Sequence, residues 1–353
     1  MNKFEEAYKA AKDALTTAFV GEMEKQRGDM SALLGADGPN EAKKAVLNKV
    51  RMAIATDSLE RRYIFWTAGE ARAITNAAGA KDSHGKRKKA ATIKLFRHLY
   101  HGSKIGGASI WVYSPPAAYD KWVFDMFTSD DDSSIMKVLN KKNEEVYSEH
   151  HRKIMVDAIS EAKRVACSAV TKLDAKGAAT KKLVEQYFTD GDAEYDVDDI
   201  MTKLSKGYKK IAAGLGSSSL VISDEPGDRL GGGWKDWAFI YTTEAMKVIY
   251  LQNAWLKKAD EASPDNSGPL HRCARTIIHE MSHKELKTED VVYGPKGLKP
   301  KGDLTGAHAL HNADSWAYFA IDVNGLLSGP GKGYAVKDCT GIRAVPKREL
   351  TLG

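Results

Sequence analysis

The most informative segment of the chain reads SGPLHRCARTIIHEMSHKELKTEDVVYG, from Ser267 to Gly294. Its start is typical of a helix N-terminus, because a serine stands near the cap position and Pro269 falls in the first turn. Apolar residues with helical spacing follow at Ile277, Ile278 and Met281. We therefore predict a helix that carries the pentapeptide His-Glu-Met-Ser-His at residues 279–283.

Two histidines of this pentapeptide are spaced to share one metal ion. Residues four apart on an α-helix differ by about 40° in direction and about 6 Å in height, so His279 and His283 point into one small volume. Two imidazoles placed in this way can occupy two corners of a zinc tetrahedron. Glu280 is turned about 100° from His279, and we expect it to act as a general base on a water at the metal. The alternative is a solvent-facing helix stripe with incidental histidines.

A catalytic zinc site also needs a third protein ligand and an open position. The extended histidine signature would require glycine at 286 and histidine at 289, where this chain has Leu286 and Glu289. That class is therefore excluded. The residues that follow offer Asp290 as an oxygen ligand and Tyr293 as a nearby phenol.

This pattern resembles the aspzincin peptidases, the deuterolysin and peptidyl-lysine metalloendopeptidase family, whose motif pairs HExxH with a downstream GTxDxxYG. The resemblance implies one catalytic Zn²⁺ ion held by His279, His283 and Asp290, with Glu280 as the general base. It also implies that Tyr293 stabilises the transition state. The activity that follows is that of a zinc-dependent endopeptidase, with proteins or peptides as substrates.

A second block, NADSWAYF from Asn312 to Phe319, resembles the family's NADS-type helix. The resemblance implies that Asp314 contributes to the pocket after the scissile bond. Asp314 is also the rival third ligand, since some metallopeptidases take that ligand from a second helix, but Asp290 and Tyr293 arrive together in the expected pattern. His308 and His311 are expected to be polar residues at a helix start, with support of the metal ligands as the alternative.

The chain departs from the family pattern at specific positions. Lys287 stands where the family has glycine, and the segment from His283 to Asp290 is about two residues shorter than in the family pattern. Lysine-specific members carry an additional acid three residues after the NADS aspartate, where this chain has Ala317. Strict lysine specificity is therefore not implied, although Asp314 could still favour a basic side chain.

Length and patterning predict an α+β protein of two domains. The chain has 353 residues, which is long for a single compact core. Residues 1–132 are predicted to form a mostly helical N-terminal domain, and residues 140–345 a zincin-like catalytic domain of helices plus a small mixed sheet with an edge strand. The acidic, serine-rich segment Thr128–Ser134 is the predicted linker.

The sequence also predicts individual helices and strands. These are long helices at 140–172 and 195–213 and strands at Ile110–Tyr113, Ser219–Ile222, Ala238–Tyr241 and Lys247–Leu251.

The composition argues against a nucleic-acid-binding protein and against a membrane-spanning protein. The net charge of +6 is too small to imply nucleic-acid binding, and no apolar run is long enough to span a bilayer.

The chain start has no recognisable signal peptide, because Glu5, Glu6 and Lys9 interrupt the apolar stretch that a signal peptide needs. We expect a secreted protein or a delivered, toxin-like effector; retention inside the cell and a trimmed signal are the alternatives. Three cysteines make no disulfide framework, and a Cys273–Cys339 bridge and free thiols both stay open.

Two hypotheses concern residues 1–132. They could be a propeptide that inhibits the catalytic domain until it is cut near Asp130–Ser134, or a delivery module of the effector. The alternative function is a non-proteolytic zinc protein whose basic run Lys86–Lys89 contacts nucleic acid or an anionic membrane. A basic run this short is more often a solvated turn.

Overall fold

The structure of the chain is a computed structural model that describes residues 105–106, 110–112, 117, 119, 146–191, 195–217, 220–229, 231, 235–242, 247–259 and 268–343. The chain divides into two compact units, one formed by Met1–Lys153 with Ser218–Ala254 and the other by Ile154–Ser217 with Trp255–Gly353. The predicted N-terminal helices, the Thr128–Ser134 linker and the Lys86–Lys89 run lie outside the described residues. The division into 1–132 and 140–345 therefore stays a prediction.

The first unit contains a mixed sheet in the strand order β1-β2-β3-β5-β4. Its strands are β1 (Ile105–Gly106), β2 (Ile110–Val112), β3 (Leu220–Ser223), β4 (Ala238–Ile240) and β5 (Lys247–Leu251). β3 pairs in parallel with β2 and β5, whereas β1 and β4 pair antiparallel with their neighbours. β3 and β5 are buried apolar strands, as expected at the centre of a sheet. β4 ends the order of the described strands, so it is an edge strand of this sheet.

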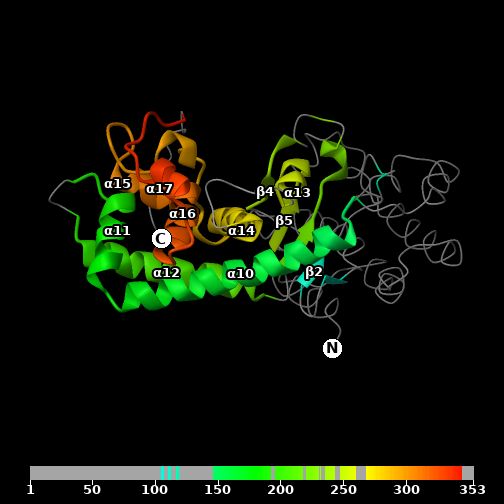
Figure 1. The fold of residues 1–353 in the computed structure, drawn as a ribbon, viewed down its shortest axis with the longest axis horizontal. Helices are drawn as coiled ribbons and strands as arrows, with labels where there is room; N and C mark the ends of the chain where they lie inside the picture. The colour runs from blue at the N-terminus through cyan, green and yellow to red at the C-terminus, as the bar shows by residue number, and fades with distance from the viewer. Residues whose placement is uncertain are drawn as a thin grey trace, which may run out of the picture. The chain divides into compact units, whose positions relative to one another are not determined.

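Helices dominate the second unit, in which α11, α12, α14, α15, α16 and α17 gather (Figure 1). The helices of the described chain are α10 (Glu149–Asp174), α11 (Ala178–Phe188), α12 (Val197–Leu215), α13 (Asn253–Ala259), α14 (Pro269–Leu286), α15 (Gly306–His311), α16 (Ala313–Val323) and α17 (Gly329–Ala335), with short 3₁₀ turns η2 (Pro226–Asp228) and η4 (Gly294–Lys296). α14 contacts both α12 and α16. This packing decides where the predicted metal-binding residues lie.

Close approaches hold α14 and α16 against α12. Gly207 faces Trp316 and Gly214 faces Met281, and a Cβ at either glycine would collide with that side chain. The Trp316 indole donates to Leu310 O at 2.8 Å, and the Tyr208 hydroxyl donates to Trp316 O at 2.6 Å. Because the buried aromatic rings around Trp316 are large, truncating it to alanine is expected to cost about 3–5 kcal/mol of unfolding free energy.

The α+β prediction is confirmed: the described chain is rich in helices and has a small mixed sheet. The two long predicted helices correspond to α10 and α12, and the motif helix to α14. All three cysteines are free in the structure, with Cys273 buried and Cys167 exposed. None of the described helices combines the length and the apolar character needed to cross a membrane.

Candidate metal centre

Helix α14 brings the two predicted histidine ligands together. Because they are one helical turn apart, the ring centroids of His279 and His283 lie 4.8 Å from each other, and their Nε2 atoms are 3.1 Å apart. The helix ends at Lys287, which adopts the left-handed conformation with φ 61°. This conformation favours glycine, so it accounts for the glycine that the aspzincin pattern has at this position.

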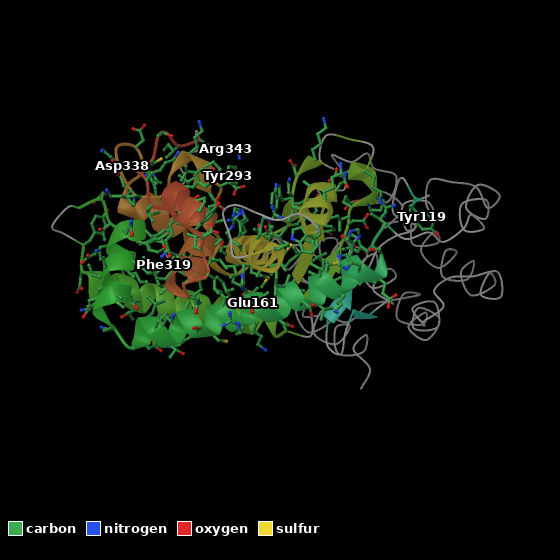
Figure 2. All side chains as sticks on the ribbon, in the orientation of Figure 1. Tyr119, Glu161, Tyr293, Phe319, Asp338 and Arg343 are labelled. Atoms are coloured by element: carbon green, nitrogen blue, oxygen red, sulfur yellow. The ribbon has the colours of Figure 1, made fainter. Side chains whose placement is uncertain are left out.

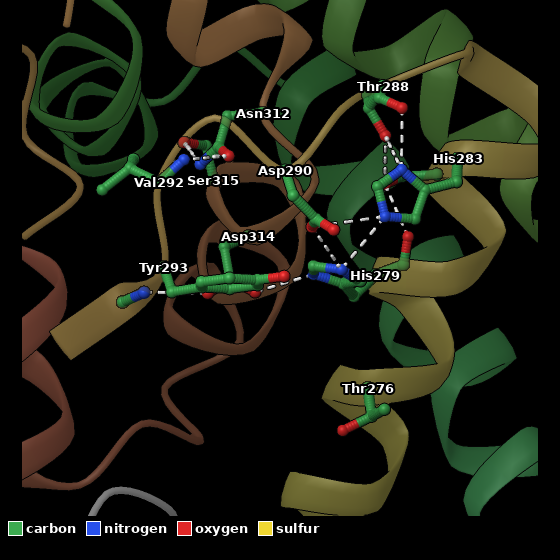
Figure 3. Close-up of polar contacts among 12 residues, drawn as sticks. Thr276, His279, His283, Thr288, Asp290, Val292, Tyr293, Asn312, Asp314 and Ser315 are labelled. Atoms are coloured by element: carbon green, nitrogen blue, oxygen red, sulfur yellow. Dashed lines mark hydrogen bonds and ion pairs between the residues drawn. The ribbon is translucent and has the colours of Figure 1, made fainter. Parts of the chain in front are cut away.

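The far nitrogens of both imidazoles are bonded to protein acceptors. His279 Nδ1 lies 2.7 Å from Asp314 Oδ1, and His283 Nδ1 lies 2.7 Å from the backbone oxygen of Thr288 (Figure 3). An acceptor at Nδ1 places the hydrogen of a neutral imidazole on that nitrogen. Each Nε2 atom therefore presents a lone pair to the space between the two rings.

Asp290 completes the cluster from the segment that follows α14. Its Oδ1 atom lies 3.1 Å from His279 Nε2 and 3.5 Å from His283 Nε2. Figure 3 shows this carboxylate on the Nε2 side of His279, with Asp314 on the opposite side. These are the predicted ligands His279, His283 and Asp290, which form the group suited to a metal among the described residues.

The donor set fits a zinc ion. Tetrahedral zinc with ligands at about 2.0–2.2 Å requires ligand atoms roughly 3.3–3.5 Å apart, close to the 3.1–3.5 Å separations of this cluster. Asp290 Oδ1 is buried, and the two Nε2 atoms face it, which suits a carboxylate oxygen that shares a cation with both imidazoles. Two nitrogens and one oxygen also leave a fourth position open, as a catalytic zinc site requires.

The ionisable side chains of the cluster shift one another's pKa values. Burial alone would lower the pKa of His279, but hydrogen bonds with Asp290 and Asp314 raise it well above the usual value. Burial would raise the pKa of Asp290, but the two histidines hold it well below its usual range. A proton thus takes the place that a metal cation would fill, and metal binding must release it.

Glu280 lies next to this cluster on α14 and is only 4% exposed. Burial raises the pKa of its carboxyl, while the charges of His279 and His283 lower it and those of Asp290 and Asp314 raise it. A raised pKa makes a carboxylate a better proton acceptor, which is what a general base needs.

Tyr293 stands at the N-terminus of η4, and its ring is nearly parallel to that of His279, with centroids 6.2 Å apart. It is 40% exposed. Burial and the nearby Asp290 charge raise the pKa of the phenol, so it stays protonated and can donate. The next residue must be glycine, because a Cβ at Gly294 would lie 2.5 Å from the Tyr318 ring.

Asp314 bonds both helix α14 and the segment that carries Tyr293. While Oδ1 bonds His279, Oδ2 accepts the backbone N–H of Gly294 at 2.8 Å. Burial would raise the pKa of this carboxyl, but His279 and Arg275 keep it below its usual range. The structure thus places Asp314 away from the Nε2 cluster, which favours Asp290 as the third ligand; the predicted substrate contact of Asp314 stays a prediction.

Sequence reasoning missed the residues that hold the Asp290 segment. Asn312 is fully buried, and its Oδ1 accepts the backbone N–H groups of Val291 and Val292 at 3.1 and 3.0 Å. The Thr288 hydroxyl lies 2.7 Å from that of Ser282 on α14. An asparagine before a predicted helix is a cap signal, but nothing in the pattern showed that its amide binds a segment 20 residues away.

His308 lies in the first turn of α15, as expected, whereas His311 is the last residue of that helix and not at its start. The Thr305 hydroxyl caps α15 by accepting the His308 N–H at 3.2 Å, and His308 Nδ1 faces Thr305 in return. The backbone oxygen of His311 accepts the Glu289 N–H at 2.7 Å. His311 thus contributes to the anchoring of the Asp290 segment through its main chain.

Two helix imidazoles, a carboxylate from a following segment and a buried glutamate are the arrangement of a zinc metallopeptidase. A comparison with protein-family models matches residues 173–321 to the aspzincin family, described as lysine-specific metallo-endopeptidases. The match supports an aspzincin assignment for this part of the chain and, with it, a zinc metalloendopeptidase. A search of curated proteins finds no match.

Proposed function

We propose that the zinc ion of this endopeptidase is held by His279, His283 and Asp290, and that Glu280 and Tyr293 carry the reaction on a polypeptide substrate. The observation behind the proposal is that the Nε2 atoms of two histidines and the buried Asp290 Oδ1 atom converge on one small volume. Zinc, when bound, supplies Lewis acidity that lowers the pKa of a water and polarises the scissile carbonyl.

In this proposal Glu280 moves the proton. Its carboxylate accepts a proton from the attacking water and then delivers it to the leaving amine. The low exposure of the side chain supports this role, because burial raises the affinity of the carboxylate for the proton.

Tyr293 stabilises the oxygen of the scissile carbonyl as negative charge develops on it. Its phenol is protonated and partly exposed beside His279, and its hydrogen, which bonds Asp290 in the structure, would turn to a substrate oxygen. Removing a donor of this kind typically costs about 10²–10³-fold in kcat.

We infer a side-chain preference broader than strict lysine specificity. Both oxygens of Asp314 are already bonded inside the protein, to His279 and to Gly294. At the position of the second acid of the lysine-specific members, Ala317 is fully buried. A peptide library in which only peptides with lysine after the scissile bond are cleaved would contradict this inference.

We further propose a secreted or delivered enzyme made as a latent proform, in which residues 1–132 inhibit the catalytic part until they are removed. The polar acidic segment Thr128–Ser134 supports this proposal, because it is suited to cleavage. Incubation of the full chain should yield a fragment of about 23–25 kDa (from about 110 Da per residue) in the wild type but not in Glu280→Gln. An uncut, fully active chain would instead favour a delivery module.

The central test compares the wild type with Glu280→Gln by metal analysis and peptide cleavage. We expect one zinc per chain in both proteins and a loss of roughly 10²–10⁴-fold in turnover for the variant. Glu285→Gln, the same substitution on the same helix, is the matched control and should keep both properties. Full activity of the Glu280→Gln protein would rule out the proposed role of Glu280.

A further inference from the structure

The segment Val336–Arg343, here called the C-terminal strap, lies beyond the family-matched residues and runs along the part of the chain that follows Asp290. Backbone hydrogen bonds of 2.9–3.2 Å join the two segments: Lys299 N to Lys337 O, Cys339 N to Lys299 O, Thr340 N to Lys296 O and Arg343 N to Val291 O. Gly297, with φ 90°, lets them approach closely, since a Cβ there would lie 2.5 Å from Asp338 O.

The strap ends beside the proposed oxyanion donor. Arg343 Nη1 donates to the Tyr293 hydroxyl at 3.2 Å, and the guanidinium carbon lies 5.4 Å from the centre of the ring (Figure 2). Because the Arg343 backbone also donates to Val291 O at 2.9 Å, its main chain and its side chain both contact the segment between Asp290 and Tyr293.

This contact fixes what the phenol can do. A guanidinium only donates, so Arg343 must occupy a lone pair of the Tyr293 oxygen. The single phenol hydrogen is then left to donate in another direction. A positive charge next to the oxygen also makes the phenol a stronger donor, because hydrogen bonds polarise one another.

We propose that Arg343 is a positioning residue for Tyr293: it occupies the acceptor side of the phenol and directs the phenol hydrogen to the carbonyl oxygen of the substrate. The proposal rests on the oxyanion role proposed for Tyr293. The C-terminal strap would then take part in the reaction, although the family match does not include it.

The test uses the zinc-loaded full chain and a quenched fluorescent peptide, with four proteins: wild type, Arg343→Ala, Tyr293→Phe and the double variant. Arg343→Ala should lose about 10-fold in kcat with KM changed less than about 2-fold, because the charge-assisted donor acts on the transition state. In the Tyr293→Phe background the same substitution should have no further effect. Arg343→Lys should retain part of the activity, and free guanidinium should restore Arg343→Ala but not Tyr293→Phe.

Thr340→Val is the matched control. The Thr340 hydroxyl belongs to the same strap and donates to Lys296 O at 3.0 Å, whereas the contact with the Tyr293 phenol is made by Arg343. It should keep kcat within about 2-fold. An equal loss in Thr340→Val would show that the strap only tethers the segment, and an effect of Arg343→Ala on KM alone would indicate a contact with the substrate. Either result overturns the proposal.

The failures of the two proposals are distinguishable. If Tyr293→Phe keeps full activity, the oxyanion role of Tyr293 is wrong. If Tyr293→Phe loses activity but Arg343→Ala lowers kcat by the same factor in both backgrounds, only the positioning role is wrong. Arg343→Gln, which keeps a donor without the charge, gives the same comparison if the alanine variant does not fold.

Discussion

Replacing Asp314 by asparagine tests how far metal binding depends on a residue outside the ligand set. In the structure the carboxylate accepts two hydrogen bonds, from His279 Nδ1 at 2.7 Å and from Gly294 N at 2.8 Å. An asparagine amide has one acceptor oxygen, so one of these two donors would face an NH₂ group. The variant also loses the negative charge that faces the imidazole.

The expected magnitude follows from these two bonds. Loss of the partner of a metal-bound histidine typically weakens metal affinity by about 10–100-fold, or about 1.4–2.8 kcal/mol. A buried donor without a partner should cost a further ~1–3 kcal/mol of unfolding free energy. Asp314→Asn should therefore bind zinc more weakly and melt earlier, without losing the site.

The assay is zinc titration against a competing chelator dye, together with thermal unfolding. Asp174→Asn is the control, because this carboxylate bonds Ser205 and Lys209 at the surface. Asp290→Ala should abolish zinc binding. A zinc Kd of Asp314→Asn within about 2-fold of the wild type would refute the reasoning. Complete zinc loss in Asp314→Asn with zinc retained in Asp290→Ala would make Asp314 the ligand.

Three further predictions concern pH, strain and packing. The pKa of His279 is raised in the zinc-free protein, so its proton stabilises the fold fully below about pH 6.5, and this stabilisation is lost as the pH rises through the raised pKa. The Tm of chelator-treated protein should fall above that pH while the Tm gain on adding zinc grows; a pH-independent zinc effect would contradict this. Lys287→Gly should relieve left-handed strain of about 1 kcal/mol and raise Tm by roughly 1–3 °C with kcat unchanged, whereas a lower Tm would show that the backbone is unstrained. Gly294→Ala should cost about 1–3 kcal/mol of stability and lower kcat, because the new Cβ pushes against Tyr318 and displaces Tyr293; wild-type values of both would refute the steric argument.

The helical half of the site could be predicted from sequence because its geometry is local. A spacing of four residues on a helix fixes the relative positions of His279 and His283 without any tertiary contact, and the structure has them as expected. Glu280 is fixed in the same way. For Asp290, sequence gave the ligand type but not its position, which depends on contacts with α16.

The rest required the fold. Asn312 and Thr288 are ordinary polar residues in the sequence, and their roles appear only when α16 and the end of α14 are in place. Arg343 lies 50 residues after Tyr293, so no local pattern connects the two. Hydrogen bonds between segments far apart in the chain carry no periodicity that a sequence analysis can detect.

The start of α16 explains why the NADS block and the metal motif belong together. Asn312 accepts N–H groups of the segment that follows Asp290, and the backbone N–H of Ala313 donates to Glu289 O at 3.0 Å. Asp314 then bonds His279 on α14. Because the positive end of a helix dipole favours an ionised carboxylate, the first turn of α16 helps to keep Asp314 negative. One helix start therefore fixes the position of the third ligand and the orientation of the first, so substitutions at Asn312 should weaken zinc binding although its side chain touches no proposed ligand side chain.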